Sequence, residues 1–405
     1  MALRLAYLSP LPPAATGVAD YSAALLPALA RHAEVEVLAE PAALSAWRAR
    51  RADRDAKLAL YPLSEFEARA DRADAIIYHL GNSAHYGAIY ERLIRRPGIV
   101  VLHDGTLHHF YVDRTLHRGD APAYLREMAY SHGAAGYDAA RLITRGAGVY
   151  PFYRFPLIRR AVDAARGVIV HGETIRQAVL EARPVTAVCV IPHLAFQAVP
   201  PARTRAEVLR RFGWPPDAFV IGSFGLVSPE KRGEALLEAF EAVAAEEPRA
   251  RLLFVGRSVP EYDLRTVAQE RGLDKRIRFA GHVRHAALPD YLSAIDAAVN
   301  LRWPTAGEAS GAVMRLLAYG KPTIVSRAGW FAELPRDAVI AVDVGEREVA
   351  QITTALRKLM RDPQARAVRG AAARDFAARL TPDAVAQQYV SFIEETIRGK
   401  HARDG

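Results

Sequence analysis

Four histidines stand at or just after the ends of short apolar runs in the first half of the chain. They are His79, His103, His171 and His193, and Asp104 follows His103 directly. Imidazole exchanges protons near neutral pH, and an adjacent carboxylate can fix its tautomer and raise its basicity. Each histidine alone is more simply a hydrogen-bonded residue at a strand end. Together they predict a polar site, with His103 and Asp104 as a candidate general base and its orienting carboxylate.

Metal binding is a weaker interpretation of this region. His103, Asp104, His108 and His109 lie close in sequence, but no helical His-x-x-x-His pair and no cysteine accompanies them. An Asp-x-Asp sequence at 53–55 lies in a polar stretch and is interpreted as a chance match. The sequence therefore predicts no metal site.

Two glycine-containing loops could bind an anion. Gly17 closes a proline-rich loop before an amphipathic stretch, and Lys231 ends the loop Pro229-Glu230-Lys231, shortly after Gly225. Backbone amides at a helix start and a lysine side chain both suit the charge of a diphosphate. A plain strand-to-helix turn and a solvated loop are the simpler alternatives. The dinucleotide fingerprint Gly-x-Gly-x-x-Gly is absent, which argues against a dehydrogenase.

A turn of small residues leads into a helix that we predict at 312–319. The turn reads Ala306-Gly307-Glu308-Ala309-Ser310-Gly311, and Gly320-Lys321-Pro322 closes the helix. Small residues would let a ligand lie against the backbone, and serine suits the N-cap position of a helix. The Glu308 carboxylate could hydrogen-bond sugar hydroxyls and stabilise positive charge at an anomeric carbon.

These residues need a scaffold, and the chain alternates short β-branched runs with amphipathic stretches throughout, as parallel strands joined by helices do. We predict strands at 3–8, 35–38, 75–78, 99–102, 168–170 and 188–191, and a second series at 220–224, 252–255, 277–280, 297–301, 323–325 and 339–342. The proline-bearing stretch 198–203 separates the two series. We therefore expect an α/β protein with two doubly wound, Rossmann-like domains, 1–197 and 203–381, facing across a cleft. The carboxyl ends of the strands form the ligand edge of such a sheet, which would gather the histidines on one side.

Composition limits the class of partner. The 405 residues carry a formal charge of +9, but only six of the 54 basic residues are lysines and the arginines are spread along the chain. Because no basic stripe with interleaved aromatics occurs, nucleic-acid binding is not predicted, whereas an anionic substrate or acidic lipid headgroups stay open. Early prolines and the lack of a long apolar stretch predict a soluble cytoplasmic protein. The single cysteine, Cys189, is expected to be a buried thiol.

The chain resembles the nucleotide-sugar glycosyltransferases of the GT-B class, and within it the retaining family four. The resemblance rests on the Gly17 loop, His79, His103-Asp104, the Lys231 loop, Phe279-Ala280-Gly281-His282, the Glu308 turn with Gly320-Lys321-Pro322, and a final helix at 382–398. It implies that the first domain binds the acceptor and that the second binds the donor. It also implies that the final helix crosses back to the first domain.

The resemblance assigns expected roles to individual residues. Lys231 would bind the donor diphosphate above Gly17, and Glu308 and His103 would contact the transferred sugar. Asp104, His79 and His171 would line the acceptor side. The remaining donor-side residues would be Gly225, Arg257, His282, Ala309, Ser310, Gly311 and Arg315. Two positions depart from the family pattern, because Leu226 stands where an arginine is usual and Arg315 where a second glutamate is usual.

The function that follows is transfer of a hexose-type sugar from a nucleoside diphosphate to an acceptor hydroxyl, with retention and without a metal or other cofactor. The acceptor would be a sugar, a lipid-linked molecule or another small molecule, and peripheral contact with the inner membrane face is allowed. One alternative is inverting transfer with His103 and Asp104 as the base. Another is a nucleotide-sugar-binding protein without activity, which Leu226 and Arg315 would favour.

Overall fold

The computed structural model describes residues 3–50, 58–148 and 150–401. Their contacts divide into two units. Unit 1 contains residues 1–194, 306–309 and 382–405, and unit 2 contains residues 195–305 and 310–381.

Unit 1 is built on a seven-stranded sheet in the order β3-β2-β1-β4-β5-β6-β7, and all of its strands are parallel. The inner strands are almost entirely apolar and buried, as a sheet covered on both faces requires. The strand order reverses between β1 and β4, and ligands bind at such switch points in open α/β sheets. The strands are β1 (Arg4–Leu8), β2 (Glu34–Ala39), β3 (Leu58–Pro62), β4 (Ala75–Leu80), β5 (Ile99–Leu102), β6 (Gly167–Val170) and β7 (Val188–Val190).

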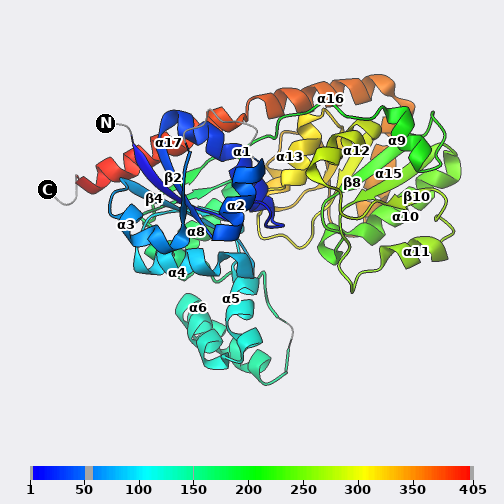
Figure 1. Ribbon diagram of the computed structural model, residues 1–405. Coiled ribbons are helices and arrows are strands. Elements are labelled where there is room, and N and C mark those ends of the chain that lie inside the picture. Colours follow the sequence, from blue (N-terminus) through cyan, green and yellow to red (C-terminus); the bar gives the residue numbers. More distant parts are fainter. Residues whose placement is uncertain (1–2, 51–57, 149, 402–405) are drawn as a thin grey trace. The chain divides into compact units, whose positions relative to one another are not determined.

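The crossover between β5 and β6 is enlarged into a helical lobe, which projects from the sheet of unit 1 (Figure 1). It contains α5 (His108–Arg114), α6 (Ala121–Thr144) and α7 (Arg159–Ala164), and α6 is kinked at Gly133, where φ is 60°. The other helices of this part of the chain are α1 (Gly17–His32), α2 (Pro41–Arg50), α3 (Phe66–Ala70), α4 (Gly87–Arg95) and α8 (Glu173–Ala182).

The last helix, α17 (Pro382–His401), completes unit 1 by packing against α1. The hydroxyls of Tyr21 and Tyr389 lie 2.9 Å apart, and both rings are fully buried. At the surface, Asp383 accepts a hydrogen bond from Arg31 at 2.6 Å. Burial of a large aromatic ring at this contact contributes about 3 kcal/mol, so α17 belongs to the core of unit 1.

Unit 2 has a parallel six-stranded sheet in the order β10-β9-β8-β11-β12-β13. Its strands are β8 (Phe219–Phe224), β9 (Ala250–Val255), β10 (Ile277–Phe279), β11 (Ala297–Asn300), β12 (Thr323–Ser326) and β13 (Val339–Val342). Its helices are α9 (Arg205–Arg211), α10 (Gly233–Glu246), α11 (Leu264–Glu270), α12 (Leu288–Ala294), α13 (Gly311–Ala318), α14 (Gly329–Ala332), α15 (Glu348–Arg361) and α16 (Pro363–Ala378).

The predicted fold class is confirmed, since each unit is a parallel, Rossmann-like α/β sheet with its own apolar core. Several details differ from the prediction. Strand β3 was not predicted, because it is a short, half-buried edge strand that ends in proline. Cys189 is half-buried and not in the core, because β7 is an edge strand. The Asp-x-Asp sequence at 53–55 lies outside the described residues.

Candidate functional site

Three of the predicted histidines form a hydrogen-bonded chain inside unit 1. Nδ1 of His79 lies 2.9 Å from Nε2 of His103, and Nδ1 of His103 lies 3.1 Å from Nε2 of His171. The chain ends at Ile191, because Nδ1 of His171 lies 2.9 Å from the Ile191 carbonyl oxygen. The residues come from β4 and from the ends of β5 and β6, so the parallel sheet brings them together as the sequence predicted. His79 lies within β4 and not after it, because β4 continues to Leu80.

The carbonyl at the end of the chain fixes the tautomer of every ring. A carbonyl only accepts, so His171 must carry its proton on Nδ1, and its Nε2 accepts when the ring is neutral. His103 then donates from Nδ1 and accepts at Nε2, and His79 donates from Nδ1. The one remaining acceptor, Nε2 of His79, is buried and has no partner among the described residues. All three rings therefore donate from Nδ1, and each donates to the next residue of the series that ends at Ile191.

Burial keeps these imidazoles neutral. The interior position lowers the pKa of His171 to about 4, and it lowers the pKa values of His79 and His103 well below the usual range. Tyr21 lies against the whole group, with its ring centroid 5.1 Å from those of His103 and His171 and 4.9 Å from that of His193. Nδ1 of His193 lies 2.7 Å from the carbonyl oxygen of Leu194. All four predicted histidines thus surround one tyrosine.

The predicted partnership of His103 and Asp104 is wrong. Both ring nitrogens of His103 face other histidines, so His79 and His171 set its tautomer, and its pKa is lowered and not raised. The Asp104 carboxylate accepts a hydrogen bond of 2.9 Å from the backbone N–H of Asn82.

Gly17 is the first residue of α1, and Thr16 caps the helix by accepting from the N–H of Ala19 at 3.1 Å. Gly17 is exposed, and no other residue comes within 4 Å of the place where a Cβ would stand. The space beside Gly17 is therefore open, and binding of an anion by this loop stays a prediction.

In unit 2, four of the predicted donor residues lie at or near the ends of neighbouring strands. Gly225 follows β8 and has a φ of 114°. A Cβ added to Gly225 would stand 4.0 Å from the ammonium nitrogen of Lys231. A Cβ on Gly256 would meet the Gly225 carbonyl oxygen at 1.7 Å, so this close approach of β8 and β9 requires glycine. Arg257 and His282 follow β9 and β10, and both are exposed. Gly225, Lys231, Arg257 and His282 thus lie around the carboxyl edge of β8, β9 and β10.

The loop that carries Lys231 is held from two sides. The carbonyl of Glu230 accepts from the N–H of Trp303 at 2.8 Å. Arg232, which has a φ of 50°, is paired with the buried carboxylate of Glu348 at the start of α15. These contacts hold the backbone on both sides of Lys231.

Residues 306–309 of the Glu308 turn belong to unit 1. The Ala306 carbonyl accepts from the N–H of Gly105 at 3.1 Å, and a Cβ on Gly105 would meet that oxygen at 2.0 Å. Gly307 has a φ of 82° and packs on Thr174 at the start of α8. Glu308 accepts from the Ala306 N–H at 2.9 Å, so its carboxylate is oriented within the turn. The turn therefore lies against the loop that follows His103 and Asp104.

Residues after the turn belong to unit 2. Ser310 caps α13, as predicted, by accepting from the N–H of Val313 at 3.3 Å, and Gly311 is the first residue of that helix. Arg315 places its guanidinium 3.6 Å from the centre of the Phe196 ring and 3.4 Å from Nε2 of His285. Ala309, the last residue of the turn that belongs to unit 1, is half-buried.

The sequence analysis missed Tyr21, Tyr389 and Asn82. Asn82 bonds to Asp104, to the amide of Phe110 and to Nδ1 of His109, and so joins the ends of β4 and β5. Its position two residues after a buried strand was a signal that could have been used. The pairing of Tyr389 with Tyr21 could not be predicted, because the two residues are 368 positions apart in the sequence.

Within the described residues, no group of three or more histidine, cysteine or acidic side chains is arranged to hold a metal ion, and no helix is long and apolar enough to cross a bilayer.

Comparison with known proteins identifies the fold and finds one family match. The chain aligns over 97% of its length with all of the Anabaena HepE structure solved with UDP-glucose, with a TM-score of 0.67 and 16% identity. WaaG, a glycosyltransferase involved in lipopolysaccharide biosynthesis, aligns over 96% of this chain and 99% of its own, with a TM-score of 0.59 and 12% identity. The fold is that of the GT-B glycosyltransferases. Residues 204–376 match the family model of glycosyl transferases group 1.

Curated relatives match over shorter lengths. A D-inositol 3-phosphate glycosyltransferase of Streptomyces bingchenggensis is 28% identical over 229 residues, which are 54% of this chain and 50% of the relative. A glycogen synthase of Mycobacterium tuberculosis is 29% identical over 160 residues, which are 39% of this chain and 37% of the relative. The matched region spans half or less of the length of these relatives.

Proposed function

We propose that the protein is a glycosyltransferase that moves a hexose-type sugar from a nucleoside diphosphate to an acceptor hydroxyl, with retention and without a metal. The observation that carries this proposal is the anchored Lys231 at the carboxyl edge of the unit 2 sheet, inside the region that matches the transferase family. A lysine held beside open backbone offsets the charge that develops on a diphosphate leaving group.

The proposal gives each of these residues a role. Unit 2 holds the nucleotide through Gly225, Lys231, Arg257 and His282, and Glu308 positions the sugar through its carboxylate. Unit 1 holds the acceptor on the side of His103. The relatives are named for an inositol phosphate and for glycogen, both rich in hydroxyls, which supports a hydroxyl-rich acceptor for this chain.

The histidine chain favours retention over the inverting alternative. A general base needs a free ring nitrogen and a pKa near the working pH. His103 has both nitrogens engaged and a lowered pKa, so it suits a positioning role better than proton removal. The anomeric configuration of the product, measured by proton NMR, separates the two mechanisms.

A thermal-shift panel with UDP, GDP, dTDP and ADP, each with and without EDTA, tests donor binding. A ligand at about one hundred times its Kd adds about 2.7 kcal/mol to stability, which is readily measured. We expect one nucleotide to stabilise the protein and EDTA to change nothing. Stabilisation by a nucleotide without turnover on any acceptor would instead favour the non-catalytic alternative, and no stabilisation by any nucleotide would contradict both.

A further inference from the structure

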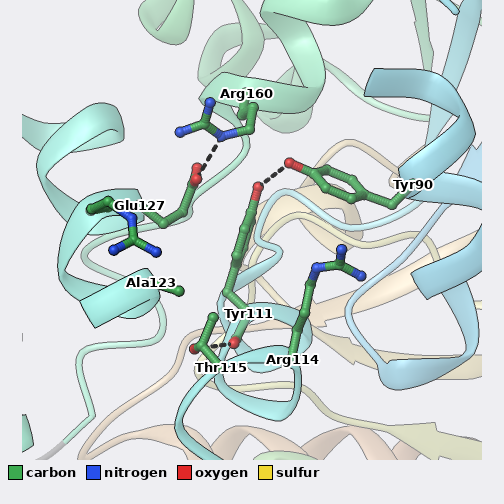
Figure 2. Close-up of a pocket in the computed structure, with 8 residues that line it drawn as sticks. Tyr90, Tyr111, Arg114, Thr115, Ala123, Glu127 and Arg160 are labelled. Carbon is green, nitrogen blue, oxygen red and sulfur yellow. Dashed lines mark hydrogen bonds and ion pairs between the residues drawn. The ribbon is translucent and has the colours of Figure 1, made fainter. Parts of the chain in front are cut away.

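The helical lobe of unit 1 contains a polar cavity, which the proposed transfer reaction does not use. Its volume is about 240 Å³. It lies among α4, α5, α6 and α7, and Figure 2 shows Glu127, Tyr111 and Arg114 around it. The lining residues are Tyr90, Tyr111, Arg114, Thr115, Ala123, Arg126, Glu127 and Arg160.

The cavity has an excess of positive charge. Three arginines line it and one carboxylate, Glu127, faces them. Glu127 is buried and satisfied, because it accepts from Arg160 at 2.6 Å and from Ser131 at 3.2 Å. A bound cation would find no free carboxylate here, whereas an anion would find guanidinium groups from separate helices.

Many of the guanidinium donors have no protein acceptor in the part of the chain that the structure describes. Arg160 uses only Nε, on Glu127, and its guanidinium stacks on the Tyr130 ring at 3.8 Å. Arg114 uses one terminal nitrogen, on Glu91 at 2.9 Å. Arg126 is exposed and has no ion-pair partner there. Planar guanidinium groups with free donors bind oxyanions through paired hydrogen bonds.

Two tyrosine hydroxyls add a further donor. The hydroxyl oxygens of Tyr90 and Tyr111 lie 2.6 Å apart, as Figure 2 shows. Burial raises the pKa of Tyr90 to about 12 and that of Tyr111 well above its usual value, so both stay protonated at neutral pH. One proton lies in the bond between them, and the other is available to a ligand.

We propose that this cavity is a binding site for a small oxyanion, such as a phosphate group, held by Arg114, Arg126 and Arg160 with a tyrosine hydroxyl. The inference does not depend on the proposed transferase activity, because none of these residues has a role in donor or acceptor binding there. The volume admits a phosphate with a short attached group, so the group can be free phosphate or part of a phosphate monoester.

Binding of sodium phosphate and of glycerol phosphate to the full chain tests the site, with sodium chloride at equal ionic strength as the reference. We expect both calorimetry and thermal shift to detect phosphate, and the Kd to rise about tenfold in Arg126→Ala and further in Arg114→Ala/Arg126→Ala. Arg126→Lys keeps the charge without the planar fork and should fall between wild type and Arg126→Ala. Arg72→Ala, which removes an exposed arginine elsewhere in unit 1, should bind as wild type does.

Because Arg126 makes no ion pair with the described residues, its removal should leave the fold intact, which far-UV circular dichroism checks. Tighter binding of glycerol phosphate than of phosphate would show that the anion is part of a larger molecule, and equal binding would show that the free anion suffices. Absence of binding by both probes in the wild type, or equal affinity in the wild type and the double variant, would overturn the proposal.

Discussion

Nε2 of His171 lies 3.1 Å from Nδ1 of His103, and the Ile191 carbonyl holds the other nitrogen of His171. His171 therefore decides which nitrogen of His103 carries a proton, although it comes from a different strand. Because these imidazoles are buried and neutral, the stability of unit 1 should depend on pH.

Stability should fall as the pH drops from about 6.5 to about 4. Unfolded histidine binds a proton near pH 6.5, whereas burial lowers the pKa of folded His171 to about 4 and holds the pKa values of His79 and His103 well below the usual range. The unfolded chain thus binds more protons in this window, so the stability is complete above it and is lost on acidification. Urea unfolding as a function of pH measures the effect. His171→Gln should make the pH dependence shallower, and replacement of the exposed His117 by Asn should not; a flat profile in the wild type would contradict the prediction.

Gly105→Ala should displace the Glu308 turn. The new Cβ would stand 2.0 Å from the Ala306 carbonyl oxygen, which is far inside van der Waals contact, so the turn must move. We expect a large loss of transferase activity with a smaller loss of thermal stability, measured by turnover and by calorimetry. Gly399→Ala, where nothing lies within 4 Å of the new Cβ, is the matched control. Normal activity in Gly105→Ala would show that the turn tolerates the shift.

Lys231→Ala should weaken nucleoside-diphosphate binding by about tenfold, because one charge-assisted contact to phosphate is lost. Isothermal titration measures the change. Lys275→Ala removes an exposed lysine elsewhere in unit 2 and should bind as the wild type does. Unchanged affinity in Lys231→Ala would remove this residue from the donor site.

Glu308→Gln should reduce turnover by about two to three orders of magnitude while preserving the fold, since an amide cannot offset positive charge on the sugar. The amide oxygen can still accept from the Ala306 N–H, so the turn keeps its shape. Steady-state kinetics measures the loss of turnover, and a thermal melt checks that the fold is preserved. Glu238→Gln, on an exposed face of α10, is the control. Full activity in Glu308→Gln would assign the sugar contact to another residue.

Tyr389→Phe should lower the free energy of unfolding by about 1 kcal/mol, because it leaves the buried Tyr21 hydroxyl without its partner. Tyr389→Ala should cost about 3–5 kcal/mol, because it also removes a buried ring. Denaturant unfolding measures both, with the exposed Gln388→Ala as reference. Wild-type stability in both tyrosine variants would mean that α17 contributes little to unit 1.

The sequence predicted the parts of the fold that depend on local pattern. Apolar runs located the inner strands, and the rule for parallel sheets placed His79, His103 and His171 at one edge. The order of hydrogen bonds among them could not be predicted, since it depends on Ile191 and on rotamers that packing selects. The cavity in the helical lobe could not be predicted either, because Arg114, Arg126 and Arg160 come from three helices with no shared motif.

The contact of α17 with α1 also bears on how the chain folds as it is made. Unit 1 begins to emerge from the ribosome first, yet the helix that covers Tyr21 emerges only after residues 195–381. At about 5–20 residues per second, this interval lasts about 10–40 s. During that time the surface of α1 that receives Tyr389 stays uncovered, so we expect nascent unit 1 to be the species that needs a chaperone, while unit 2 can mature before synthesis ends.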